Sequence, residues 1–349
     1  LAIGAFWCAA PALVEGNTVI LKPSEDAPLS SQIASEIYHD AGIPAGVFNV
    51  IYGDGTTGDW LARDESVDHI CFTGSAEVGQ HIRRICADSW HKTCSCELGS
   101  KSAVIAFDDA NFDLAVSASL ASAFKLSGQR CVSSGRILVQ RGIYDAFVDK
   151  FVHYAEQIKA GHPFVDRGNI VGGALFANEA AYMGPLINQQ QFDRVLGFNQ
   201  MVREDKEATV LVDSHHQRPG YFVSPMVYKT EWRDAPYLKQ EVFGPHVALI
   251  PFDTVDDAIR IYNDTDYGLA VGVITEDFKK ARLCRDGCDY GMCYWNGGSI
   301  AAESHMAFGG VKKSGNGFPS AARTFQAVTH EVSWTVNHDE SLQFPQGME

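Results

Sequence analysis

Strand-like and helix-like segments alternate through residues 18–98, and this alternation restricts the fold more than any other feature of the chain. A short β-branched segment at 18–21 predicts a strand, and further strands are predicted at 47–52, 67–72 and 93–98. Helical periodicity predicts helices over 2–14, 30–42 and 77–89. Strands joined through helices run parallel, so the pattern predicts an α/β fold with a doubly wound parallel sheet. Ligands bind such sheets outside the carboxyl ends of the strands.

The later sequence predicts a second α/β unit. Strand-like segments lie at 103–107, 136–140, 208–212, 222–227 and 247–251, and helix-like segments lie at 114–125, 143–160, 255–263 and 277–285. We therefore expect a partial Rossmann-like cofactor-binding domain at 1–99, a catalytic domain at 100–312 and a C-terminal tail at 313–349. The tail alternates as a strand over 327–336. Residues 161–186 form a long loop to which the sequence assigns no role.

Composition argues against several classes of function. The chain has 349 residues, of which 46% are hydrophobic, so it can bury the cores of two domains. The net charge is −15 and no dense Lys/Arg cluster occurs, which argues against binding nucleic acid or an anionic membrane. No apolar run approaches the roughly 18 residues of a membrane span. The composition therefore argues against a polyanionic partner and for a soluble protein.

Nine cysteines without regular spacing favour reduced thiols and a cytoplasmic location. No paired C-x-x-C units are present, and the histidines His215 and His216 lie far from the cysteines in sequence, so we expect no bound metal. Cys131 differs from the others because it lies between a glycine-containing turn and the strand predicted at 136–140. Such junctions commonly present reactive side chains. The alternative is that Cys131 is an ordinary buried cysteine.

Eight segments, in order along the chain, resemble signatures of the aldehyde dehydrogenase superfamily. They are Leu21-Lys22-Pro23-Ser24-Glu25, Phe72-Thr73-Gly74-Ser75 with Gly79, Glu97-Leu98-Gly99, Gly128-Gln129-Arg130-Cys131, Glu241-Val242-Phe243-Gly244-Pro245, Asn263-Asp264-Thr265-Asp266-Tyr267-Gly268-Leu269, Asn296 and Phe308-Gly309-Gly310. The 34 positions from Glu97 to Cys131 match the family's separation of general base and nucleophile. The resemblance implies an NAD(P)-dependent enzyme that oxidises an aldehyde to a carboxylic acid, in a chain truncated at its N-terminus.

The resemblance also implies the catalytic roles. Cys131 would attack the aldehyde carbonyl, and Glu97 would activate the water that hydrolyses the resulting thioester. Arg130 and nearby backbone N–H groups are expected to lower the pKa of the thiol. The backbone N–H of Cys131 would stabilise the oxyanion together with an asparagine that the family carries just before the position of Leu1. We therefore expect the fragment to be catalytically impaired.

For the cofactor, the resemblance implies NAD, with NADP possible. A carboxylate at Glu25 would accept hydrogen bonds from a ribose 2′-hydroxyl and repel a 2′-phosphate. The turn after Phe72 would bind the pyrophosphate at the start of a helix. Core packing is the alternative for Phe243. The candidate cofactor residues are Lys22, Ser24, Glu25, Gly55, Phe72, Thr73, Gly74, Ser75, Val78, Leu98, Glu241 and Phe243.

The chain departs from the family pattern at several positions. Ser100 replaces the usual glycine, and Cys8 replaces a frequent lysine. Three polar residues, Lys125, Arg130 and His305, replace apolar ones and favour an anionic semialdehyde substrate. An equally weighted alternative is that the Lys125 side chain extends into solvent and does not contact the substrate.

Asn296 matches an asparagine near the substrate entrance, or else is a turn residue. In the family such a tail pairs with a neighbouring subunit, so the resemblance implies a homodimer or homotetramer. Two other readings of the whole chain are a non-catalytic module that keeps the fold and a thiol hydrolase that works without nicotinamide.

Overall fold

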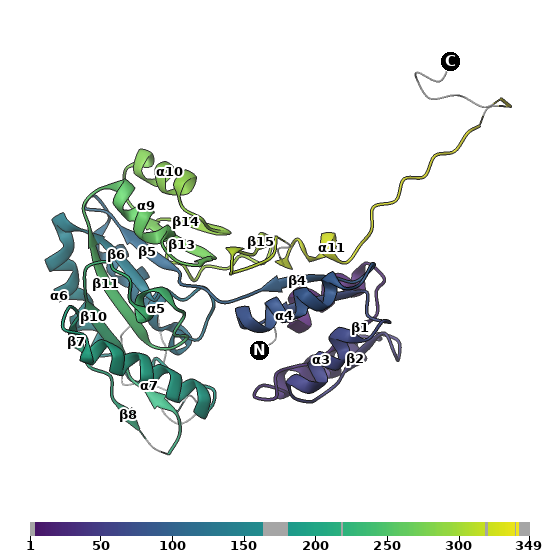
Figure 1. Cartoon of the computed structure of the whole chain (residues 1–349), viewed down its shortest axis with the longest axis horizontal. Helices are drawn as coiled ribbons and strands as arrows, with labels where there is room; N and C mark the ends of the chain where they lie inside the picture. Colours follow the sequence, from purple (N-terminus) through teal and green to yellow (C-terminus); the bar gives the residue numbers. More distant parts are fainter. Residues whose placement is uncertain (1–3, 163–180, 218, 318–319, 339, 342–349) are drawn as a thin grey trace.

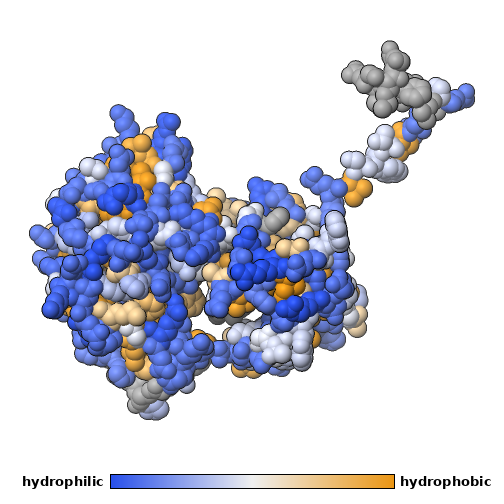
Figure 2. Space-filling model, in the orientation of Figure 1, coloured by the Kyte–Doolittle hydropathy of each residue, from blue (hydrophilic) through white to orange (hydrophobic). Residues whose placement is uncertain are grey.

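The computed structural model describes residues 4–162, 181–217, 219–317, 320–338 and 340–341. Figure 1 shows two bodies, one formed by the early part of the chain and one by the middle part, and a C-terminal segment that runs from the larger body along the smaller one. Figure 2 shows hydrophilic residues over most of the visible face of both. No helix in the described part of the chain is long and apolar enough to cross a membrane.

The smaller body contains two parallel strand pairs. In the first, β1 (Val19–Leu21) pairs with β2 (Phe48–Val50), and in the second, β3 (His69–Thr73) pairs with β4 (Thr93–Glu97). The π-helix η1 (Gly4–Cys8) and the helices α1 (Ala9–Val14), α2 (Leu29–Asp40), α3 (Gly55–Arg63) and α4 (Ala76–Ala87) accompany them. Side-chain caps explain two helix starts: Asp54 accepts from the N–H of Thr56, and Ser75 accepts from that of Val78. The expected strand–helix alternation is confirmed.

The larger body is built on a seven-stranded sheet in the order β14-β13-β5-β6-β11-β10-β7. Its strands are β5 (Ala103–Ala106), β6 (Arg136–Gln140), β7 (Thr209–Val212), β10 (Met226–Lys229), β11 (His246–Phe252), β13 (Ala270–Ile274) and β14 (Met292–Trp295). All neighbours are parallel except β10 and β7. The sheet is therefore mixed, with an antiparallel strand at one edge, and the α/β class is confirmed.

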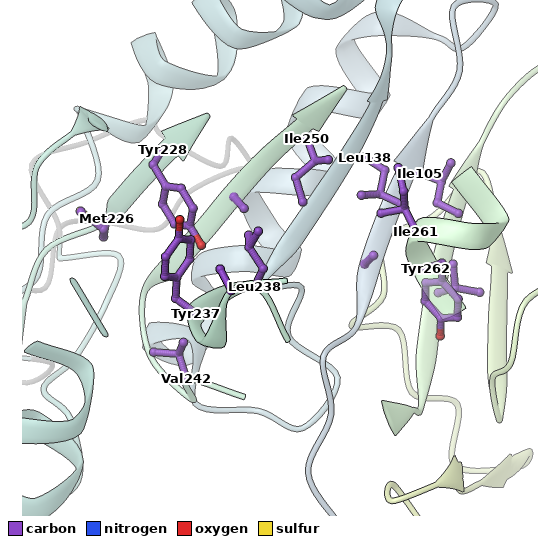
Figure 3. Close-up of a cluster of buried hydrophobic side chains, with 14 of the residues drawn as sticks. Ile105, Leu138, Met226, Tyr228, Tyr237, Leu238, Val242, Ile250, Ile261 and Tyr262 are labelled. Carbon is purple, nitrogen blue, oxygen red and sulfur yellow. The ribbon is translucent and has the colours of Figure 1, made fainter. Parts of the chain in front are cut away.

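Helices cover both faces of this sheet. They are α5 (Phe112–Phe124), α6 (Tyr144–Ala155), α7 (Gln189–Glu204), α8 (Pro236–Lys239), α9 (Val255–Asn263) and α10 (Phe278–Gly287), with the 3-10 turns η2 (Lys125–Gly128) and η3 (Arg141–Ile143). Along β5, Ile105 faces one apolar core and Val104 the other, since strand side chains alternate between faces. Figure 3 shows part of the first core, in which Tyr228 of β10 lies against Tyr237 of α8.

The C-terminal segment differs from the prediction. Helix α11 (Thr324–Ala327) occupies the start of the expected strand, and no strand is assigned at 328–338. A strand needs a hydrogen-bonded neighbour, and this segment extends away from both bodies in Figure 1. The side chains of Val332 and Trp334 are 85% and 88% exposed. The oligomer expected from this tail stays a prediction.

Two other expectations need correction. The strand predicted at 222–227 is divided between β9 (Phe222–Val223), which pairs with β8 (His216–Gln217), and β10. The helix predicted at 143–160 ends with α6 at Ala155. Most of the long loop expected at 161–186 lies outside the described residues.

Arg136, at the start of β6, is a buried cation that connects three segments of backbone. Only 1% of it is exposed, and its guanidinium donates to the carbonyl oxygens of Lys101, Ile261 and Tyr262. Burial lowers its pKa to about 10. The fold of the larger body therefore depends on a polar residue inside its core.

Replacing Arg136 with alanine is expected to lower the free energy of unfolding by about 3–5 kcal/mol, because buried carbonyl oxygens lose their donor. Urea unfolding followed by circular dichroism measures the change. Arg260→Ala is the control, since Arg260 is exposed and pairs with Asp257 on the surface; its expected effect is below about 1 kcal/mol. Equal losses in the two variants would contradict the assignment.

Candidate active site

The candidate site forms where loops meet at the amino ends of the parallel strands β5, β6 and β11. The loop 98–102 connects β4 to β5, the loop carrying Cys131 enters β6, and residues 241–245 enter β11. Because β5, β6 and β11 are neighbours, these loops lie side by side. Glu97 ends β4 opposite Thr73 of β3, so the carboxyl ends of the strands in the smaller body adjoin the same region.

The loop before Cys131 has an unusual backbone. Leu126, Ser127 and Gly128 have φ values of 56°, 58° and 67°, in the left-handed region that non-glycine residues seldom adopt. A Cβ at Gly128 would lie 2.2 Å from the carbonyl oxygen of Gly244, so only glycine fits there. Strain of this kind persists where surrounding contacts fix the chain, and it is frequent at functional sites.

The described end of the long loop helps to fix this backbone. Ser127 Oγ donates to the carbonyl oxygen of Gly184 at 2.8 Å, and Gln129 Nε2 donates to that of Pro185 at 3.2 Å. The N–H of Ile187 donates back to Gln129 Oε1 at 3.0 Å. The segment that the sequence left without a role therefore supports the loop of the candidate nucleophile.

Cys131 is half-buried and packs against an apolar cluster that includes Val132, Leu269 and Phe308. Burial raises the pKa of its thiol to about 12, and the nearby carboxylates of Glu241 and Glu97 act in the same direction. Arg130 and the N–H of Val132 act to lower it. The expected lowering of the thiol pKa is therefore wrong for this structure, because desolvation outweighs the adjacent cation.

Glu97 is 6% exposed, and its Oε2 has no hydrogen-bond partner among the described residues. Burial raises its pKa to about 9, while the N–H of Ser320 acts to lower it. Its carboxyl group borders a small cavity shared with Cys8, Cys71 and Ser320. Glu97 and Cys131 are thus near enough for their charges to interact, yet no hydrogen bond joins them in the described part of the chain.

Glu241 connects the loops. Its Oε1 accepts from the N–H of Ser100 at 2.8 Å, and its Oε2 occupies the space where a Cβ on Gly99 would lie, 2.3 Å away. Burial raises the pKa of Glu241 to about 7. Phe243 is half-buried with a φ of 57°, so it too is held in a strained conformation.

The residues proposed from the sequence for the adenosine end of a cofactor cluster around the carboxyl end of β1. Lys22 Nζ donates to the carbonyl oxygens of Pro23 and Gly53 and lies 4.0 Å from Glu25. Its stem passes Gly58 of α3, where a Cβ would be 3.5 Å from Lys22 Cε. Gly55 begins the same helix, and Ser24 is exposed beside Glu25. A half-buried amine and an exposed carboxylate offer a donor and an acceptor that fit ribose hydroxyl groups.

The turn before α4 has the chemistry of a phosphate site. It presents the N-terminus of a twelve-residue helix at the carboxyl end of β3. Phe72 covers Gly74, because a Cβ on Gly74 would lie 2.4 Å from its ring. A Cβ on Gly79 would lie 2.4 Å from the side chain of Leu98, so the glycine permits α4 to approach that residue. Thr73 and Val78 are exposed at this turn. The residues present therefore fit a dinucleotide.

The four candidate substrate residues do not gather in one place. Arg130 lies beside Cys131 and donates to the carbonyl oxygen of Ile300 at 3.2 Å. Lys125 is exposed at the end of α5, and His305 is exposed beside Glu303.

Asn296 follows β14, at the end of the sheet opposite to the Cys131 loop, and its Oδ1 accepts from the N–H of Thr275. Its φ of 52° fits the turn interpretation, and its place near the substrate entrance stays a prediction.

The structure adds residues that the sequence did not assign. Ser320 reaches Glu97 from a distant segment, and nothing in the sequence signals this contact. Ser100 contacts both Glu241 and Cys131, and its departure from the family glycine was the available signal. All nine cysteines are free, and no group of three or more potential ligands is placed to hold a metal in the described ranges.

Comparison with known proteins supports these observations. The model of the aldehyde dehydrogenase family matches residues 2–333. The chain belongs to the aldehyde dehydrogenase family. Among solved aldehyde dehydrogenases, it is 35% identical to gamma-glutamyl-gamma-aminobutyraldehyde dehydrogenase from Burkholderia cenocepacia J2315, with a TM-score of 0.84, covering 92% of this chain and 63% of that one.

Lactaldehyde dehydrogenase from Escherichia coli is 31% identical, with a TM-score of 0.83, covering 91% of this chain and 64% of that one. An NADP-dependent enzyme from E. coli is 33% identical, with a TM-score of 0.83, covering 92% of this chain and 64% of that one. The chain therefore spans under two thirds of the length of the aldehyde dehydrogenase structures that it matches.

Proposed function

We propose that the full-length protein oxidises an aldehyde to a carboxylic acid with a nicotinamide cofactor, through a covalent intermediate on Cys131. The observation that supports this most is the meeting of the Cys131, Glu241 and Glu97 loops at one end of the sheet, with charges that influence one another. A cysteine of a purely structural kind does not require a strained loop or two neighbouring carboxylates.

In this proposal the sulfur of Cys131 attacks the carbonyl carbon, and the N–H of Cys131 donates to the oxyanion. Bound NAD would accept the hydride that converts the adduct to a thioester. Glu97 then takes a proton from water, whose oxygen attacks the thioester carbon; the C–S bond breaks, and the acid leaves with Cys131 as its thiolate. Because Glu97 borders the cavity beside Cys8, its carboxylate has to turn toward the sulfur for this step.

The proposed cofactor site uses both strand pairs of the smaller body together with a loop of the larger body. Lys22 and Glu25 would hold the adenosine ribose, the turn at Gly74 and Ser75 the pyrophosphate, and Glu241 and Phe243 the nicotinamide ribose and ring. The direct test is a panel of aldehydes mixed with the full-length protein and NAD while NADH absorbance is followed. Retained NAD binding without turnover of any aldehyde favours a non-catalytic module, and ester cleavage without any binding of nicotinamide favours a hydrolase.

Cofactor choice gives a second test. NAD is expected to be preferred, because the Glu25 carboxylate repels a 2′-phosphate. Glu25→Ala should reduce the ratio of kcat/KM for NAD over NADP by about tenfold, which corresponds to about 1.4 kcal/mol. Glu36→Ala is the control, since Glu36 is an exposed glutamate on α2 that pairs with Gln32. An unchanged ratio in Glu25→Ala would remove Glu25 from the ribose site.

We further propose an anionic semialdehyde as the substrate class. The support is now Arg130 alone, because Lys125 and His305 are both exposed while Arg130 is half-buried beside the nucleophile. Comparing semialdehydes with uncharged aldehydes of equal length tests this choice. Equal kcat/KM values for the two series would reject a role for Arg130 in recognising a carboxylate.

A further inference from the structure

Ser100 is a buried serine with an unusually complete set of contacts. It is 3% exposed and lies between β4 and β5. Its hydroxyl donates to the carbonyl oxygen of Cys131, and its Oγ is 3.0 Å from Ser102 Oγ and 3.3 Å from Ser102 N. A hydroxyl has one hydrogen, so the bond to Cys131 makes Ser102 the donor in the other two contacts. The orientation of the Ser100 hydroxyl is therefore fixed.

The carbonyl of Cys131 belongs to a peptide group that also reaches the sulfur. The oxygen of Cys131 and the N–H of Val132 lie in one rigid plane, so fixing the direction of the oxygen fixes that of the N–H. That N–H acts to lower the pKa of the Cys131 thiol. A second restraint acts one residue later, where Ser299 Oγ donates to the carbonyl oxygen of Val132 at 2.6 Å.

The backbone of Ser100 acts on the other side. Its N–H donates to Glu241 Oε1, and the adjacent Gly99 has no Cβ that would displace this carboxylate. One residue therefore contacts the loop of the nucleophile through its side chain and the expected cofactor-ribose carboxylate through its main chain. A glycine at position 100, the usual family residue, would retain the second contact and lose the first.

We propose that Ser100 is a positioning residue, whose hydroxyl orients the peptide group between Cys131 and Val132 and so sets the backbone that carries the nucleophilic sulfur. The proposal rests on the proposed role of Cys131. The orientation of this peptide group matters because the thiol is buried. In a desolvated site few groups stabilise a thiolate, so the direction of a single N–H changes the fraction of anion substantially.

The test is the rate at which iodoacetamide alkylates Cys131 in the full-length protein, without cofactor or aldehyde, from pH 7 to 11. Mass spectrometry of the peptide that carries Cys131 separates it from the other cysteines. Ser100→Ala is expected to alkylate about tenfold more slowly at each pH in this range, because less thiolate forms when the peptide group beside the sulfur is no longer held in place. Ser100→Gly should behave in the same way and serves if the alanine variant does not fold.

Ser119→Ala is the matched control, since Ser119 is also buried but its Oγ has no hydrogen-bond partner among the described residues. Its alkylation profile should equal that of the wild type. Wild-type profiles in both Ser100 variants would overturn the proposal. This readout does not involve aldehyde turnover, so the positioning role fails or succeeds separately from the dehydrogenase activity.

Discussion

Cys131→Ala should lower kcat for aldehyde oxidation by at least roughly 10⁴-fold in the full-length protein, because the variant has no atom that can carry the acyl group. The fold should persist, since Cys131 is only half-buried and alanine is smaller. Binding of NAD should remain within a few fold, because the residues proposed to hold the adenosine lie in the smaller body. Steady-state NADH formation and calorimetric titration with NAD measure the two effects.

Cys293→Ala is the control for this substitution. Cys293 is also half-buried but belongs to β14 and packs against the large core. Its variant should retain near wild-type turnover. If Cys131→Ala retains near-normal turnover, or if both variants lose activity together with their far-UV circular dichroism, Cys131 is not the nucleophile.

The α/β class and the order of elements were predictable because they depend on local patterns. The strand-like segments that became β1 to β5 are visible in the sequence itself. The parallel order also predicts which loops share an end of the sheet, and this brings the loops of Cys131 and Glu97 together without any knowledge of side-chain contacts.

Other features were not predictable because they depend on packing between distant segments. The raised pKa of Cys131 follows from desolvation, which a neighbouring arginine in the sequence does not reveal. Asn296 matched a motif, yet its side chain caps Thr275 at the other end of the sheet. Residues 327–336 alternate like a strand, but no strand is assigned over 328–336 in this single chain. Each of these features depends on a neighbour in three dimensions, which a local sequence pattern does not reveal.

Glu97→Gln should retain the first hydride transfer at each site and slow every later turnover. The amide cannot take a proton from water, so the thioester should accumulate, and steady-state turnover should fall by roughly 10²–10⁴-fold. A rapid burst of NADH close to one equivalent per site is expected, followed by a slow phase, and stopped-flow absorbance separates the two. The exposed carboxyl of Glu204, which pairs with Gln200, provides the control Glu204→Gln, with no expected change. An unchanged steady-state rate in Glu97→Gln would contradict the base role.

The pH dependence follows from the burial of Glu97. With a pKa of about 9, the carboxylate is a minor form at pH 7, so wild-type deacylation should rise with pH up to about 9 and then level, a rise that Glu97→Gln should lack.

The stability of the fold gives an independent check, because it should fall with pH over the range in which deacylation rises. A carboxyl group whose pKa is raised on folding stabilises the fold fully below its unfolded pKa, and this contribution is lost as pH rises through the folded value. The free energy of unfolding should therefore fall with pH between about 4.5 and 9 more in the wild type than in Glu97→Gln. Equal slopes would show that Glu97 is not buried in solution, even if its activity profile agrees.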